Sequence, residues 1–131
     1  MATKICFMNI DLKKKSGLLL FDFWASWCGP CRKANKIELQ ELHRTHSKNN
    51  ITLIGISLDK NESDWKKAVQ EDNTSWLQLI DNTGNSLSEH LRIYAFPTYI
   101  VTDHDLKILY ESNNFYAVQQ FLSAYSGGNR H

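Results

Sequence analysis

The most informative stretch of this sequence is Phe23-Trp24-Ala25-Ser26-Trp27-Cys28-Gly29-Pro30-Cys31-Arg32. It begins at the end of a nearly all-apolar run, residues 18–24, and leads into a segment of good helix formers. A cysteine in the first turn of a helix lies at the positive end of the helix dipole, beside unpaired backbone N–H groups. Both features favour the thiolate over the thiol, so we expect Cys28 to be reactive.

The spacing of the two cysteines places both sulfurs on one face of the helix, close enough for a disulfide with little backbone movement. Pro30 suits the first turn, where its missing N–H costs nothing. We interpret Cys28 as the exposed attacking thiol and Cys31, one turn further in, as the buried thiol that resolves a mixed disulfide. Two alternatives stay open: half of a zinc site, although the five histidines supply no evident second ligand pair, and an inert pair.

Composition restricts the possible classes of protein. The chain has 131 residues, 42% of them hydrophobic, and a formal net charge of +1, which argues against a nucleic-acid partner. No apolar run approaches the roughly 20 residues that cross a bilayer. Three cysteines exclude a disulfide-rich scaffold. We therefore expect one domain over residues 1–131, with a poorly defined segment at 1–15 and a frayed tail at 126–131.

Apolar periodicity predicts alternating strands and helices along the chain. Mixed alternation of this kind favours an α/β sheet with helices on both faces. The predicted strands are residues 4–8, 18–24, 51–58, 76–80, 98–102 and 107–111. The predicted helices are residues 30–47, 63–72, about 86–91 and 115–125.

The cysteine-containing stretch resembles the active-site segment of the thioredoxin superfamily, and Phe96-Pro97-Thr98 resembles the cis-proline loop of that family. The resemblance covers about residues 16–125. It implies the α/β thioredoxin fold, a central mixed β-sheet flanked by helices. An extra helix and short strand at about 60–82 are similar to the TlpA-like branch, which are thiol-disulfide reductases of the bacterial cell envelope.

Asp22 lies six residues before Cys28, inside the apolar strand. The resemblance implies that its carboxyl is buried beneath the disulfide. Burial raises the pKa of a carboxyl, so Asp22 could take the proton from Cys31 during resolution. The alternative is a charge that only marks the edge of a strand.

A substrate-binding surface is expected around the two motifs. The resemblance implies a cis peptide bond before Pro97, which turns the Phe96 backbone toward a substrate chain so that the two pair like short strands. Trp27 would be a flat apolar docking surface, with a partly buried core tryptophan as the alternative. The residues expected to bind substrate are Trp27, Gly29, Pro30, Phe96, Pro97 and Thr98.

Three positions depart from the pattern of the family, and a fourth is the cysteine outside the pair. Lys36 stands where the family's helix has the proline that kinks it, and Ala34 stands where many TlpA-like members have a glutamate. Gly55 occupies the strand position where thioredoxin places a lysine near its buried aspartate. Cys6 is the odd cysteine, and three interpretations stay open for it: a small buried apolar residue, a mixed-disulfide site, or an accident of truncation.

We interpret the protein as a thiol-disulfide oxidoreductase that reduces disulfides of partner proteins through the Cys28–Cys31 couple, because the Gly-Pro dipeptide resembles that of reducing members. It would need an upstream thiol reductant, no metal and no cofactor beyond the redox-active disulfide, and it would act as a monomer. Its expected location is the bacterial envelope with the signal removed, or alternatively the cytoplasm. Two rival functions are a thiol peroxidase-like enzyme and a non-enzymatic docking module.

Overall fold

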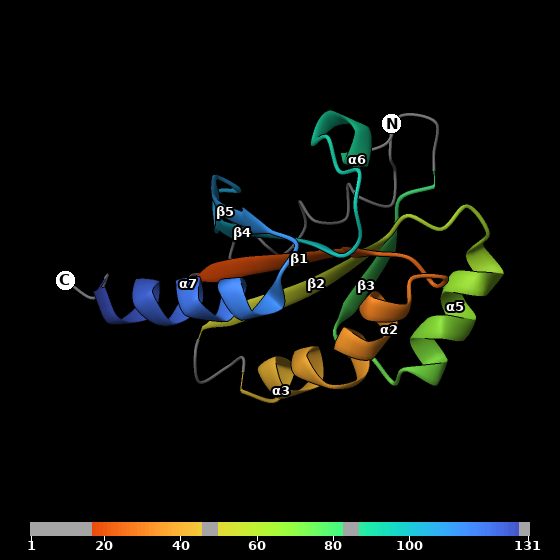
Figure 1. Cartoon of the computed structure of the whole chain (residues 1–131), viewed down its shortest axis with the longest axis horizontal. Helices are drawn as coiled ribbons and strands as arrows, with labels where there is room; N and C mark the ends of the chain where they lie inside the picture. The colour runs from red at the N-terminus through yellow and green to blue at the C-terminus, as the bar shows by residue number, and fades with distance from the viewer. Residues whose placement is uncertain (1–16, 46–49, 83–86, 129–131) are drawn as a thin grey trace.

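The computed structural model describes residues 17–45, 50–82 and 87–128, with the side chains of 126–128 left out (Figure 1). The strands in these ranges form one mixed sheet with the order β3-β2-β1-β4-β5. β1, β2 and β3 run parallel, whereas β4 pairs antiparallel with β1 and β5 antiparallel with β4. The strands are β1 (Leu18–Trp24), β2 (Ile51–Ser57), β3 (Leu77–Ile80), β4 (Thr98–Asp103) and β5 (Ile108–Ser112).

Helices cover both faces of this sheet. Figure 1 shows α3 and α7 on one side and α6 on the other. The alternation of side chains along β1 explains this arrangement, since Leu20 packs with Leu39 and Val118 of the first side, whereas Phe21 packs with Leu87 of the second. The helices are α2 (Gly29–Lys36), α3 (Glu38–Arg44), α5 (Glu62–Glu71), α6 (Leu87–His90) and α7 (Phe115–Gly128).

The thioredoxin fold expected from the resemblance is therefore confirmed, with a central mixed sheet flanked by helices. α5 and β3 occupy the range predicted for the insertion at 60–82. Asn61 caps α5, because its side chain accepts hydrogen bonds from the backbone N–H groups of Ser63 and Asp64. The strand predicted at 4–8 and the residue Cys6 lie outside the described residues.

The single helix predicted over 30–47 is wrong, because the helix breaks at Ile37 into α2 and α3. The Ile37 backbone has φ −119° and ψ −79°, and its N–H is shared between two carbonyl groups at 3.1 and 3.3 Å. The two halves are tied separately to one turn, since Asn35 donates to the carboxylate of Asp72 and Gln40 donates to the backbone carbonyl of the same residue. The helix therefore breaks at Ile37 without a proline, between two segments that tertiary contacts hold separately.

Candidate active site

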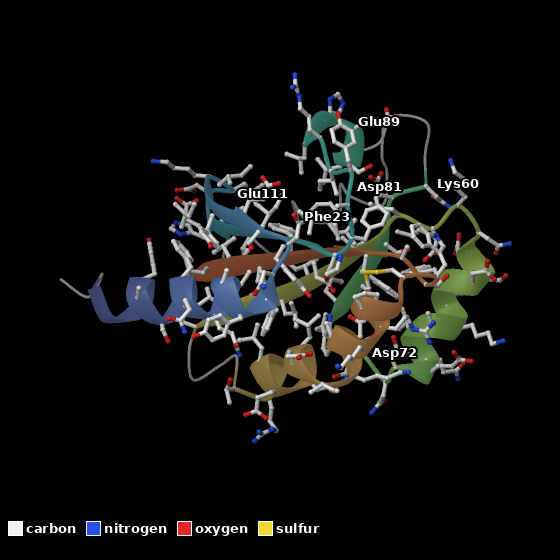
Figure 2. All side chains as sticks on the ribbon, viewed as in Figure 1. Phe23, Lys60, Asp72, Asp81, Glu89 and Glu111 are labelled. Carbon is white, nitrogen blue, oxygen red and sulfur yellow. A yellow bond between two sulfur atoms is a disulfide. The ribbon has the colours of Figure 1, made fainter. Side chains whose placement is uncertain are left out.

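Cys28 and Cys31 form a disulfide at the amino-terminal end of α2, with their Cα atoms 5.2 Å apart; Figure 2 shows its sulfur–sulfur bond in yellow. Cys28 is the N-cap of α2, and its sulfur accepts a hydrogen bond from the Cys31 backbone N–H at 3.2 Å. Pro30 lies in the first turn, as predicted. The attacking position is therefore held at the positive end of the helix dipole.

The disulfide is less accessible than expected for an exposed attacking thiol. Cys28 is 6% exposed and Cys31 is 1% exposed. The expectation that Cys28 is exposed is corrected here, because both sulfurs pack in a cluster with Trp24 and Ala68, against which Phe96 also packs. The predicted order is kept, with Cys28 as the outer cysteine and Cys31 as the inner one.

Asp22 is buried in the centre of the sheet, on the same face of β1 as Leu20 and Trp24. Its side chain is 1% exposed, and neither carboxyl oxygen has a hydrogen-bond partner among the residues that the structure describes. Burial raises the pKa of Asp22 to about 8. A carboxyl with such a pKa can both take up and release a proton near neutral pH.

The sheet register identifies the neighbours of Asp22. Its partner on β2 is Gly55, as the comparison with thioredoxin suggested, so no lysine faces it from this position. Its partner on β4 is Tyr99. Burial raises the pKa of the Tyr99 phenol, and the charges of Asp22 and Glu38 raise it further.

Asp59 holds the loop that precedes Cys28. Its carboxylate is buried and accepts hydrogen bonds from the Ser26 backbone N–H at 3.0 and 3.2 Å and from the Ser26 hydroxyl at 2.7 Å. The hydroxyl of Ser57, at the end of β2, donates to the same carboxylate. Sequence reasoning missed this residue, although a carboxylate directly after a buried strand was an available signal.

Arg32 ties the active-site helix to the insertion. Its Nε donates to Asp72 at 2.6 Å, one Nη donates to Glu71 at 2.9 Å, and the other donates to the Ser26 carbonyl at 2.9 Å. The hydrogen bond to Asp72 is the main cause that raises the pKa of Arg32. Figure 2 labels Asp72 between α2 and α5. The sequence contains no local pattern that pairs these residues.

The second motif forms a loop opposite the disulfide. The Phe96–Pro97 peptide bond is cis. Thr98 is 2% exposed, and its hydroxyl donates to the Ala95 carbonyl at 2.6 Å. Asn113 donates to the Thr98 hydroxyl at 2.9 Å and to the Pro97 carbonyl at 3.0 Å. The Thr98 side chain therefore supports the loop from inside, together with Asn113, which sequence reasoning missed.

An exposed aromatic surface adjoins both motifs. Trp27 is 69% exposed, and its ring meets that of Phe96 edge to face with centroids 5.5 Å apart. The alternative that Trp27 is a core residue is wrong. Gly29 has open space above its Cα. A groove of about 370 Å³ extends from Pro30 and Pro97 toward Tyr116.

Within the described ranges, no three or more His, Cys, Asp or Glu side chains are grouped so that they could hold a metal ion. In the same parts of the chain, none of the helices combines the length and the apolar character that a membrane span needs.

The family model described as Thioredoxin-like matches residues 17–108. The chain belongs to the thioredoxin-like family. Thioredoxin from Coprinus comatus is 27% identical over 104 residues, which cover 76% of each chain. The thiol-disulfide oxidoreductase ResA from Bacillus thuringiensis subsp. konkukian is 26% identical over 79% of this chain. The match spans 59% of the ResA sequence.

Solved structures agree with this assignment. A thiol-disulfide oxidoreductase from Bacteroides fragilis NCTC 9343 is 34% identical, with a TM-score of 0.75 over 88% of this chain and 85% of that one. The thioredoxin domain of a thiol-disulfide oxidoreductase from Bacteroides vulgatus is 31% identical, with a TM-score of 0.71 over 86% and 82% of the two chains. Together with the disulfide between Cys28 and Cys31, these matches identify the chain as a thiol-disulfide oxidoreductase.

Proposed function

We propose that the protein reduces disulfide bonds in partner proteins. The Cys28 thiolate attacks one sulfur of the substrate disulfide, which forms a mixed disulfide and releases the first substrate thiolate. Asp22 takes the proton from the Cys31 thiol. The Cys31 thiolate then attacks the Cys28 sulfur, which forms the Cys28–Cys31 disulfide and releases the second substrate thiolate. Two electrons pass to the substrate, and an upstream thiol reductant restores the dithiol.

The position of the disulfide between surface and core carries this proposal. Its outer sulfur belongs to Cys28, the N-cap of α2, beside the exposed ring of Trp27. Its inner sulfur belongs to Cys31, which is buried in the same cluster as Trp24. Trp24 shares its face of β1 with Asp22, so the helix with the cysteines covers the side of the sheet that holds the carboxyl.

The proposed substrate is an extended protein segment that lies across Trp27, Gly29, Pro30 and the loop of Phe96 and Pro97. Exposed aromatic rings supply apolar docking area with little loss of side-chain entropy. The backbone beside Pro97 offers hydrogen-bonding groups to such a segment. Support for this surface comes from the exposure of Trp27, the open space at Gly29 and the groove that begins at Pro30 and Pro97.

The proposal also covers the location of the protein, its oligomeric state and its cofactors. We place the protein in the bacterial cell envelope, supported by its similarity to the TlpA-like branch and by the insertion at 60–82 that this branch shares. It would act as a monomer and would use no metal or organic cofactor, since thiolates alone carry two electrons between disulfides.

The reduction potential of the Cys28–Cys31 couple tests this direction of transfer. Equilibration across a glutathione series at fixed pH should give a value near the roughly −270 mV of thioredoxin. A value above about −180 mV would contradict the reductase proposal and indicate an oxidase or isomerase. The absence of any two-electron transition would leave only a docking module.

Trapping of substrate proteins tests the assignment of the two cysteines. Cys31→Ser should accumulate mixed disulfides with partner proteins, because the resolving thiol is lost, whereas Cys28→Ser should accumulate none. Peroxide should not oxidise the reduced protein faster than a protein disulfide does. Faster turnover of peroxide through a sulfenic acid at Cys28 would favour the peroxidase alternative.

A further inference from the structure

Three residues form a row across the centre of the sheet. Asp22 on β1 pairs in register with Gly55 on β2, and Gly55 pairs in register with Gln78 on β3. Side chains at paired positions of parallel strands project from the same face of the sheet. Because Gly55 has no side chain, the row contains a gap between the carboxyl of Asp22 and the side chain of Gln78.

The amide of Gln78 fills this gap. A Cβ atom built on Gly55 would lie closest to Oε1 of Gln78, 2.8 Å from the amide carbon and 2.9 Å from Nε2. The amide group therefore lies directly over Gly55, on the side of the sheet that holds Asp22. A single methyl group at position 55 would displace it, so the glycine is what allows the glutamine to extend toward Asp22.

The hydrogen bond from Trp24 determines how the side-chain amide of Gln78 is oriented. The indole nitrogen of Trp24 donates a hydrogen bond to Oε1 of Gln78 at 3.3 Å. An indole can only donate, so the oxygen of the amide must face it and the NH₂ group must face elsewhere. Nε2 is buried and has no hydrogen-bond partner among the described residues, as is also true of both oxygens of Asp22. The row thus contains a buried donor without an acceptor, Nε2 of Gln78, and two buried acceptors without a donor, the carboxyl oxygens of Asp22.

We propose that Gln78 is a positioning residue for Asp22: its NH₂ group donates, through one buried water molecule, to the carboxylate and stabilises the ionised form. This inference rests on the proposed role of Asp22 as the base for Cys31. A base must be ionised before it can accept a proton, and the burial of Asp22 opposes ionisation. Water can reach the amide, because Gln78 also lines a surface groove of about 500 Å³ between α5 and β3.

Other titratable groups lie around Asp22, and a test must separate their effects on its pKa from the effect of Gln78. Tyr99 faces it from β4, and its phenol is a second possible donor. Glu38 of α3 acts on the phenol of Tyr99, and the two thiols of α2 titrate when the protein is reduced. In the oxidised protein the cysteines do not titrate, so the pKa of Asp22 can be measured there without coupling to them.

The test is a titration of the Asp22 carboxyl in the oxidised protein, followed by ¹³C NMR with labelled aspartate and assigned by its loss in Asp22→Asn. Gln78→Met keeps the length of the side chain and removes both the donor and the acceptor of the Trp24 indole, and because the donor is lost the pKa of Asp22 should rise by about one unit. The ionised fraction at pH 7 would fall about tenfold. The pH profile of resolution by Cys31, measured in the reduced protein, should shift toward alkaline pH by a similar amount.

Two further variants keep the proposal falsifiable. Gln78→Glu preserves the shape and puts an acid in place of the donor, so it should raise the pKa of Asp22 more than Gln78→Met does. Gln70→Met, on α5 and outside the row, should leave the titration unchanged. Folded Gln78 variants with an unchanged pKa of Asp22 would overturn the inference, as would a shift caused by Tyr99→Phe and not by Gln78→Met.

The failure of the inference and the failure of the proposed function can be distinguished. If Asp22→Asn resolved mixed disulfides as fast as the wild-type protein, Asp22 would not be the base, and the proposed role of Asp22 would be wrong. The titration of the carboxyl in the Gln78 variants does not depend on turnover. It would still show whether Gln78 stabilises the ionised form of Asp22.

Discussion

Asp72, at the end of α5, accepts a hydrogen bond at 2.6 Å from Nε of Arg32, the residue that follows the second cysteine. The carboxyl of Asp72 is fully buried, and it also accepts from the amide of Asn35 at 3.2 Å. The insertion is thus attached to the helix that carries the disulfide by two donors on successive turns of that helix. We infer that the insertion supports the active site mechanically.

Removing this carboxylate should therefore destabilise the fold. Asp72→Ala leaves the Nε of Arg32 and the buried amide of Asn35 without their acceptor, although the other nitrogens of Arg32 keep Glu71 and the Ser26 carbonyl, and this should cost about 3 kcal/mol of unfolding free energy. Urea denaturation followed by fluorescence measures the loss. Glu41→Ala removes the exposed pair with Arg44 and should cost less than about 0.5 kcal/mol. Equal losses in the two variants would show that the contact of Asp72 contributes no more than a surface ion pair.

Asp59 should be needed to hold the loop before Cys28. Asp59→Ala removes the acceptor of the Ser26 N–H and of two hydroxyl groups, so unfolding free energy should fall by about 2 kcal/mol. The rate of attack by Cys28 on a peptide disulfide should fall as well, because the loop no longer fixes the cysteine. Asp105→Ala, in the exposed turn after β4, is the matched control. A variant that is destabilised but attacks at the normal rate would limit Asp59 to a structural role.

The buried carboxyl of Asp22 should make stability fall as pH rises. Its pKa is raised from 3.8 to about 8, so between these values the folded protein binds a proton that the unfolded chain has released. The stabilising protonation is complete at low pH, and it is lost progressively as the pH rises from about 4 to 8. The oxidised wild-type protein should be less stable at pH 8 than at pH 5, by an amount on the order of 3 kcal/mol.

Asp22→Asn should abolish most of this pH dependence and should be more stable than the wild-type protein at pH 8, because an amide cannot be ionised. Urea unfolding of both oxidised proteins at pH 5 and pH 8 measures the difference. A wild-type protein that is equally stable at the two pH values would show that Asp22 has an ordinary pKa.

A side chain at position 55 should displace the amide of Gln78. Gly55→Ala places a Cβ within 3 Å of amide atoms of Gln78, so this flexible side chain must move away and lose its hydrogen bond with Trp24, which should cost about 1 kcal/mol of stability. Gln78→Ala removes those atoms, and the double variant should recover part of the loss. A double-mutant cycle measures the coupling between the two positions. Additive losses would indicate that the methyl group is accommodated without contact to Gln78.

The exposed ring of Trp27 should matter for binding and little for folding. Trp27→Ala should raise KM for a protein disulfide about tenfold, since an exposed aromatic anchor is lost from the docking surface. Its Tm should change little, and its rate with a small disulfide should stay near that of the wild-type protein. Ile108→Ala, an exposed apolar residue on β5, should change neither constant. An unchanged KM in Trp27→Ala would exclude this residue from the substrate surface.

The local features of the site could be predicted from the sequence. The apolar strand 18–24, the cysteine pair after it and Pro30 in the first helical turn depend on contacts within a few residues. The burial of Asp22 was implied by the resemblance to thioredoxins, and its raised pKa follows from the effect of burial on a carboxyl. The break at Ile37 did not follow, because it accompanies contacts with a turn more than 30 residues away.

The sequence by itself thus determined the α/β fold class and the redox pair, because periodicity and spacing within short stretches indicate them, and its resemblance to thioredoxins indicated the buried acid. Only the tertiary structure decided the partners of these groups: Asp59 with Ser26, Asp72 with Arg32, and Gln78 across Gly55. These partners lie 33, 40 and 23 residues apart. Their pairing depends on strand order and register, which are set by the packing of the whole sheet.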